Sequence, residues 1–171
     1  MTVSHPIPAA AVAFVRDTER GIEVYLSRRP AHFRYYPGAF VFPGGRKDDE
    51  DEDIKITACR EVKEEIGIEI APQGLVLLRD ILTNSRAGPV YHMQTFAYQA
   101  TGKFLTELNL DEVDEEIWIT AQEALVKLYI PYQVSAAIYT ISRFANVEDL
   151  FRALAVGHIN DNYKLHKDYW L

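Results

Sequence analysis

The chain has 171 residues, 48% of them hydrophobic, which is enough to fold around one core without disulfides or a metal. This composition excludes a disordered, collagen-like or low-complexity protein. The formal net charge of −7 argues against a protein that binds nucleic acid through its phosphates. We expect residues 1–171 to form a single domain.

The first apolar segment is too short to cross a membrane. Ala9–Val15 has 7 residues, whereas a transmembrane helix needs about 20. No basic segment precedes it, so it does not resemble a signal peptide. The single cysteine, Cys59, cannot form an internal disulfide, which is typical of reducing compartments. These features predict a cytoplasmic protein that does not bind membranes.

Several segments favour strands because they are rich in β-branched, aromatic and other apolar residues. Ala10–Val15 and Ile22–Ser27 predict a hairpin with a loop of 6 residues between them. A short strand is expected at Phe40–Phe42, ended by a Pro-Gly-Gly sequence at residues 43–45. Later strands are expected at Gly74–Leu82, Tyr91–Thr101 and Ile117–Ile119.

The clearest helix signal lies at residues 53–66. Apolar side chains recur there at intervals of four residues and form one stripe: Ile54, Ala58, Val62 and Ile66. Asp53 is a suitable N-cap, and Gly67 is suited to end the helix in a left-handed conformation. The stripe therefore predicts a helix with one buried face.

Three further helices are expected later in the chain. Thr120 and Glu123 form a capping-box pattern that begins a helix at residue 121, and Pro131 suits the first turn of the next one. The last is expected at Val147–Val156, before Gly157. Strands come first, one helix interrupts them, and helices follow. This order predicts an α/β (α+β) fold with a mixed sheet between helices rather than a doubly wound sheet.

The helix at residues 53–66 carries a group of carboxylates. Glu61, Glu64 and Glu65 share one face, where each like-charge pair costs an isolated helix about 0.2–0.5 kcal/mol. The last two also lie at the negative end of the helix dipole. Penalties gathered at one place are typical of functional sites, and such carboxylates suit Mg²⁺ bound together with phosphates. A solvated acidic face balanced by Arg60 is the alternative.

The glycines before this helix and the carboxylates on it together resemble the Nudix box. That pattern is Gly, five residues, Glu, seven residues, Arg-Glu-apolar, one residue, Glu-Glu, one residue, Gly-apolar. The matching positions are Gly45, Glu52, Arg60, Glu61, Val62, Glu64, Glu65, Gly67 and Ile68. Because 6 residues rather than five separate Gly45 from Glu52, Glu50, Asp51 and Glu52 are alternatives for the first glutamate.

The resemblance implies a Nudix fold over nearly the whole chain and hydrolysis of a diphosphate joined to another group, with Mg²⁺ or Mn²⁺ as the cofactor. It implies that the Gly45 carbonyl and the carboxylates of Glu61, Glu64 and Glu65 surround the metal. Arg60 is expected to pair with a motif glutamate and hold it in position. The general base is left open between Glu64 and a glutamate from a later loop. Nudix proteins often dimerise, so the resemblance also makes a homodimer an expectation.

A later acidic segment offers the further glutamate that many Nudix enzymes bring to the metal site. The candidates lie within residues 111–116: Glu112, Glu115 and Glu116. Their spacing does not choose among them, and a solvated acidic loop is the alternative.

The segment before the box is the densest basic part of this acidic chain. Residues 26–38 contain Arg28, Arg29 and Arg34 and lead directly into the Phe-Pro-Gly-Gly sequence. This segment resembles the signature of the coenzyme A pyrophosphatase branch of Nudix enzymes. The resemblance implies cleavage of coenzyme A or acyl-coenzyme A into 3′,5′-ADP and 4′-phosphopantetheine, free or acylated. Arginine forks suit phosphate oxygens, so these three residues are candidates for substrate binding.

Two other functions are considered. ADP-ribose, a dinucleotide or a nucleotide sugar is an alternative substrate within the same family. A Nudix-like nucleotide-binding module without turnover is an alternative of another class. Loss of a box glutamate would mark such a module, and Glu61, Glu64 and Glu65 are all present.

Overall fold

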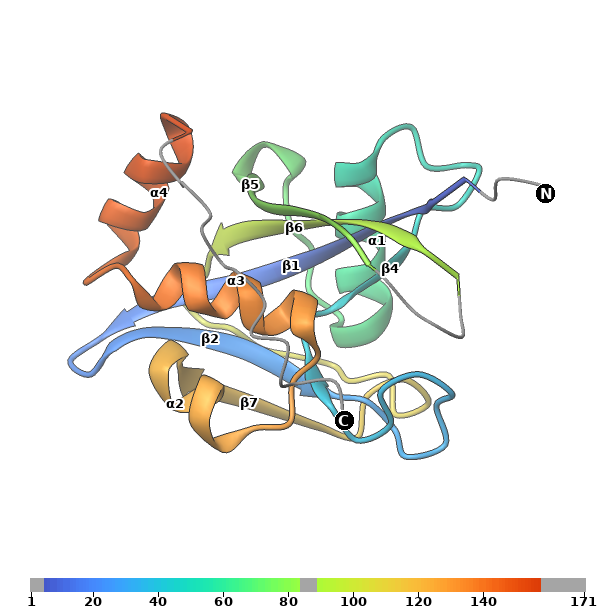
Figure 1. Ribbon diagram of the computed structural model, residues 1–171, viewed down its shortest axis with the longest axis horizontal. Coiled ribbons are helices and arrows are strands. Elements are labelled where there is room, and N and C mark those ends of the chain that lie inside the picture. The colour runs from blue at the N-terminus through green and yellow to red at the C-terminus, as the bar shows by residue number, and fades with distance from the viewer. Residues whose placement is uncertain (1–4, 84–88, 158–171) are drawn as a thin grey trace.

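The computed structural model describes residues 5–83 and 89–157. Within these ranges the chain forms a seven-stranded mixed sheet and four α-helices (Figure 1). The strands are β1 (Ile7–Thr18), β2 (Gly21–Arg28), β3 (Phe40–Val41), β4 (Gly44–Arg46), β5 (Val76–Leu82), β6 (Tyr91–Gln99) and β7 (Glu115–Thr120). The helices are α1 (Ile54–Ile66), α2 (Ala121–Lys127), α3 (Tyr132–Ser142) and α4 (Val147–Ala155). The predicted mixed α+β class is confirmed.

Strand β1 organises the sheet. The strand order is β3-β2-β1-β6-β5, with β4 added beside β1 and β7 beside β2. β1 runs parallel to β6 along Ile7–Val15 and antiparallel to β2 and β4. β4 pairs with Ala9–Ala11, whereas β2 pairs with Val15–Thr18. The glycine-rich segment therefore lies beside the middle of the sheet.

The core has two layers because alternate side chains of β1 point to opposite faces of the sheet. Ala10, Val12 and Phe14 pack with the stripe of α1. Ala11, Ala13 and Val15 pack with residues of α2, α3 and α4. The sheet is thus covered by α1 on one face and by the three later helices on the other (Figure 1).

Helix α1 forms as its sequence predicts. The Asp53 side chain accepts hydrogen bonds from the backbone N–H groups of residues 55 and 56 at 2.8 and 3.0 Å, which caps the helix. Gly67 ends it with φ of 74°, a conformation that glycine adopts without strain. Ala58, Val62 and Ile66 are fully buried. Because this apolar stripe packs against the sheet, the opposite face of α1 turns away from the sheet.

The predicted six-residue hairpin loop is wrong. The β1–β2 ladder continues to Thr18 opposite Gly21, so the connection is much shorter. Arg16 and Glu23 are cross-strand partners, with Nη2 of Arg16 2.7 Å from Oε2 of Glu23. This cross-strand ion pair stabilises polar residues within the two strands. The pattern of apolar residues gave no sign of the pair, so it placed the strand ends too early.

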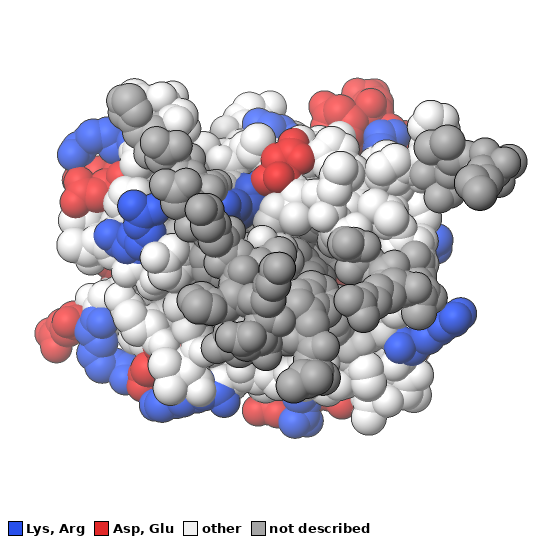
Figure 2. All heavy atoms as spheres, viewed as in Figure 1, with Lys and Arg blue, Asp and Glu red and all other residues white. Residues whose placement is uncertain are grey.

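The later elements differ from their predicted bounds by a few residues. A short 3₁₀ turn at Pro72–Gly74 precedes β5, β6 ends at Gln99, and β7 extends over Glu115–Thr120. In the described residues no helix combines the length and apolar character that crossing a membrane requires. The described part of the face in Figure 2 carries interspersed acidic and basic side chains around its rim.

Candidate active site

Two carboxylates of α1 face a cleft of about 700 Å³. Its acidic side is formed by Glu61 and Glu65 from α1, Glu112 from the loop before β7, and the glycines of β4. Arg29 and residues 33–36 line the cleft as well. Its wall also includes Tyr91, Met93, Tyr132 and Gln133. One cavity therefore joins acidic, basic and aromatic side chains that are far apart in the sequence.

The glycines of β4 let the α1 carboxylates lie against the sheet. A Cβ on Gly45 would stand 2.5 Å from Cδ of Glu61. The Gly44 N–H points to Oε2 of Glu65 at 3.4 Å. On its other side, a Cβ on Gly44 would stand 2.6 Å from Cα of Ala11. The sequence predicts that a strand ends at these glycines, whereas they begin the separate strand β4. Because glycine has no side chain, β4 leaves room for the carboxylates of Glu61 and Glu65.

We expect Gly45→Ala and Gly44→Ala to have different effects. The Gly45 substitution displaces only the flexible end of Glu61, so the melting temperature should hold while kcat falls roughly 10- to 100-fold. The Gly44 substitution pushes against the backbone of β1 and should cost about 1–3 kcal/mol of folding stability. Thermal melting and steady-state kinetics of both variants test this. If Gly45→Ala folds and its kcat is unchanged, turnover does not depend on the close approach of the Glu61 carboxylate to β4.

Arg60 holds the carboxylates at the rim of the cleft. Its Nη1 donates to Oε1 of Glu61 and to Oε2 of Glu64, each at 3.0 Å. Its Nη2 donates to the Arg46 carbonyl at 2.9 Å and to Oδ2 of Asp51 at 3.0 Å. Arg60 thus contacts two of the motif glutamates and connects α1 to the loop that precedes it.

Among the three alternatives for the first box carboxylate, the structure brings Asp51 to Arg60. Asp51 is only 7% exposed, and it also accepts hydrogen bonds from the Thr57 hydroxyl at 2.9 Å and the Asp48 N–H at 3.0 Å. These bonds, chiefly those from Arg60, lower the pKa of Asp51 to about 2. Glu50 and Glu52 are exposed. Five residues separate Gly45 from Asp51, as in the family pattern, whereas 8 rather than seven separate Asp51 from Arg60.

The three α1 glutamates do not share one environment. Glu61 and Glu65 are half-buried and line the cleft, one helical turn apart. Glu64 is exposed, lies outside the lining of the cleft, and pairs with Arg60. Two of the three expected metal ligands on α1 therefore reach the cleft in this structure.

The three later glutamates are also separated by the structure. Glu112 lines the cleft with Glu61 and Glu65. Glu115 pairs with Arg28 at 3.0 Å. Glu116 accepts hydrogen bonds from the hydroxyls of Tyr25 at 2.7 Å and Thr106 at 2.9 Å. Only the first of the three candidates faces the α1 carboxylates.

The acidic side of the cleft is crowded with negative charge. Burial and the nearby carboxylates of Glu61 and Glu112 raise the pKa of Glu65 well above its ordinary value. Burial is also the main cause that raises the pKa of Glu61. Across residues 5–83 and 89–157, neither Glu65 nor Glu112 forms a salt bridge. The half-buried Glu65 and the exposed Glu112 interact with the Arg29 guanidinium only beyond salt-bridge distance, so their oxygens remain available to a divalent cation.

The side chains do not form a complete metal cage. In the described part of the chain, no group of three or more histidine, cysteine, aspartate or glutamate side chains is close enough to hold a metal ion. Mg²⁺ commonly keeps several waters and joins one or two carboxylates to substrate phosphates. An open set of carboxylates in a cleft suits this mode of binding, in which the substrate adds further oxygen ligands.

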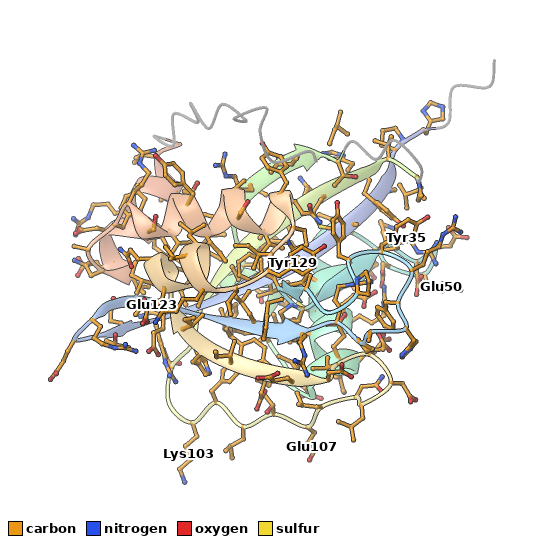
Figure 3. All side chains as sticks on the ribbon, turned by 60° about the horizontal axis from the view of Figure 1, so that its bottom comes forward. Tyr35, Glu50, Lys103, Glu107, Glu123 and Tyr129 are labelled. Atoms are coloured by element: carbon orange, nitrogen blue, oxygen red, sulfur yellow. The ribbon has the colours of Figure 1, made fainter. Side chains whose placement is uncertain are left out.

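Two of the three candidate arginines lie in the cleft. Nε of Arg29 donates to the Tyr35 carbonyl at 3.0 Å, and the Arg29 guanidinium lies 4.6 Å from the Phe33 ring centre. Arg34 lies 5.4 Å from the ring centre of Tyr35, which is labelled in Figure 3. Burial lowers the pKa of Arg29. Arg28 is outside the lining of the cleft, and its guanidinium pairs with Glu115.

The wall of the cleft contains residues that the sequence did not single out. Tyr91 and Met93 come from β6, and Tyr132 and Gln133 begin α3. The parallel pairing of β6 with β1 places Met93 beside Ala9, which also pairs with Arg46 of β4. No local pattern signals this pairing, since the two strands are far apart in the sequence.

The fold is similar to that of solved NUDIX hydrolases. A NUDIX hydrolase from Alicyclobacillus acidocaldarius matches with a TM-score of 0.74 at 20% identity, covering 90% of this chain and 97% of that chain. A MutT NUDIX hydrolase from Burkholderia pseudomallei matches with a TM-score of 0.67 at 21% identity, covering 80% of this chain and 98% of that chain. At this level of identity the likeness shows the fold.

The sequence identifies the family. The NUDIX domain model matches residues 6–137, more than half of the chain, so the chain belongs to the NUDIX family. A Caenorhabditis elegans protein named peroxisomal coenzyme A diphosphatase ndx-8 is 32% identical over 110 residues, which cover 64% of this chain and 46% of that protein. The chain thus spans less than half the length of this curated relative. Nudix hydrolases act on small-molecule diphosphates and generally use divalent cations.

Proposed function

We propose that the protein hydrolyses the diphosphate linkage of coenzyme A or acyl-coenzyme A, giving 3′,5′-ADP and 4′-phosphopantetheine, free or acylated. The observation that carries the proposal is the single cleft that joins Glu61, Glu65 and Glu112 to Arg29 and Arg34. Similarity to a relative named as a coenzyme A diphosphatase supports the same substrate class. The proposal includes Mg²⁺ or Mn²⁺ as the cofactor.

The carboxylates and arginines have complementary tasks in this reaction. A divalent cation bound at the carboxylates would neutralise phosphate charge and lower the pKa of a bound water. Glu61, Glu65 and Glu112 would supply oxygen ligands, and Arg60 fixes the orientation of Glu61 through its Nη1 hydrogen bond. Glu64 takes no part in the lining of the cleft, so we place the proton-accepting group among the carboxylates that do.

The basic side of the cleft favours a substrate with an additional phosphate. Coenzyme A carries a 3′-phosphate besides its diphosphate, and a guanidinium can bind two phosphate oxygens at once. Arg29 and Arg34 lie among aromatic rings in the same cleft. These rings offer apolar contact to a nucleobase while the guanidinium groups contact phosphate.

We therefore expect kcat/KM for coenzyme A to exceed that for dephospho-coenzyme A by roughly 10- to 100-fold, because a charge-assisted contact contributes about 1.5–3 kcal/mol. Arg34→Ala should erase much of this preference. Arg28→Ala is the matched control, since Arg28 pairs with Glu115 outside the lining of the cleft. Steady-state kinetics with both substrates at saturating Mg²⁺ measure the ratio.

Equal kcat/KM for the two substrates, or a clear preference for ADP-ribose, would reject coenzyme A as the substrate. A screen of coenzyme A, acyl-coenzyme A, ADP-ribose, NADH and diadenosine polyphosphates with Mg²⁺ or Mn²⁺ would then identify the diphosphate that is used. Binding without turnover of any of them would instead favour a nucleotide-binding module.

A further inference from the structure

The loop between β6 and β7 is fastened to the C-terminal end of α1. The backbone N–H of Glu107 donates to the carbonyl of Ile66, and that of Asn109 donates to the carbonyl of Glu65, both at 2.9 Å. Carbonyls in the last turn of a helix have no partner within the helix, so the loop supplies one. Lys103 and Glu107 point outward from this loop in Figure 3.

Asn109 connects this anchor to a side chain of the cleft. Its Nδ2 donates to Oε1 of Glu112 at 2.9 Å. Its Oδ1 accepts from the N–H of Asp111 at 3.2 Å, and its carbonyl accepts from the N–H groups of Glu112 and Val113 at 2.9 and 2.8 Å. One residue therefore links the main chain of Glu65 to the carboxylate of Glu112.

The Glu112 carboxylate is exposed and has charge neighbours of both signs: the Arg29 guanidinium attracts it, whereas Glu61 and Glu65 repel it. Glu61 and Glu65 are both close enough to feel its charge, and an exposed carboxylate would turn away from them into water. A lysine or arginine partner would hold it but would also cancel its charge. The Asn109 amide is a neutral donor, so it orients the carboxylate and leaves the charge available.

We infer that Asn109 is a positioning residue that holds the Glu112 carboxylate toward Glu61 and Glu65 for binding a divalent cation. This inference rests on the proposed function and adds a residue outside the Nudix box to its site. It explains why Glu112 lies in the cleft. Glu115 and Glu116 have other partners, which are Arg28 for Glu115 and the hydroxyls of Tyr25 and Thr106 for Glu116.

The direct test is Asn109→Asp in the full chain. Aspartate keeps the backbone N–H and an oxygen for the N–H of residue 111, but it replaces the donor to Glu112 with a repelling oxygen. We expect Mn²⁺, measured by calorimetry without substrate, to bind about 10-fold more weakly, the lower end of the loss found when a partner of a metal ligand is removed. The melting temperature of the metal-free protein should change little.

A double-mutant cycle separates positioning from a general loosening of the loop. In a Glu112→Ala background, Asn109→Asp should cause no further loss of Mn²⁺ affinity, because its target is gone. Thr106→Val is the matched control, since it removes a hydrogen bond to Glu116 in the same loop and should leave Mn²⁺ affinity unchanged. Equal losses in both backgrounds, an unchanged affinity in Asn109→Asp, or a similar loss in Thr106→Val would each overturn the inference.

The proposed function is tested separately by turnover of coenzyme A in the wild-type protein. Wild-type turnover without coupling between residues 109 and 112 would reject the inference and keep the function. Coupled Mn²⁺ binding without turnover of coenzyme A would keep the inference and reject the substrate.

Discussion

Glu65→Gln and Glu61→Gln are expected to keep the fold and to lower kcat by at least about 100-fold. Both carboxylates line the cleft one helical turn apart, and glutamine preserves their size while removing the negative charge that a divalent cation requires. Loss of one group that stabilises charge in a transition state has effects of this size. Steady-state kinetics with coenzyme A at saturating Mg²⁺, together with circular dichroism, measure the two expectations.

The stability of the Glu65→Gln variant should depend on pH in a defined direction. The pKa of Glu65 is raised by folding, so the folded state binds more protons there than the unfolded state, and this carboxylate destabilises the fold as pH rises above its unfolded pKa. Glutamine removes that penalty. In metal-free buffer, the melting temperature of the variant should equal or exceed that of the wild type at pH 8, and the gain should shrink toward pH 4.

Glu69→Gln serves as the control for both measurements. Glu69 is exposed just beyond α1, where it pairs with Lys63 at 2.6 Å, and it does not line the cleft. Its substitution should leave kcat within about twofold, because exposed ion pairs contribute little. Near-normal turnover in both Glu61→Gln and Glu65→Gln would remove these residues from the active site.

The elements that the sequence predicts well are those set by local chemistry. Asp53, the four-residue apolar stripe and Gly67 each act within a few residues of the chain, and α1 begins and ends where they indicate. The same holds for α3 after Pro131 and α4 before Gly157. Local capping and periodicity were therefore sufficient to find the helix that carries the candidate site.

The arrangement around the cleft depends on contacts that local patterns do not encode. Glu64 and Glu65 are adjacent in the sequence, yet the helix turns one toward Arg60 at the surface and the other into the cleft. The place of β4 depends on how closely its glycines approach β1, which no propensity predicts. Glu112 is distinguished from Glu115 and Glu116 only once the strand partners Arg28 and Tyr25 are known.

Asp51→Asn is expected to destabilise the fold by roughly 2 kcal/mol at pH 7. Folding lowers the pKa of Asp51 from 3.8 to about 2, and this shift corresponds to about 2 kcal/mol of stability. The contribution is present above the unfolded pKa and is lost as pH falls through the folded pKa. The gap between wild type and variant, measured by denaturant unfolding, should therefore narrow between pH 5 and pH 2.

The same substitution should lower kcat through Arg60 rather than through direct contact with substrate. Without the Asp51 charge, the guanidinium keeps its bonds to Glu61 and Glu64 but loses the buried carboxylate that fixes its position. We expect a moderate fall in kcat, smaller than in Glu61→Gln, with KM for coenzyme A nearly unchanged. Asp48→Asn is the matched control, because Asp48 is exposed and lies 3.5 Å from the same guanidinium, so that variant should retain both stability and turnover. Two results would reject this role of the buried Asp51–Arg60 pair. One is an Asp51→Asn variant as stable as the wild type at pH 7, and the other is an equal loss of stability and turnover in Asp48→Asn.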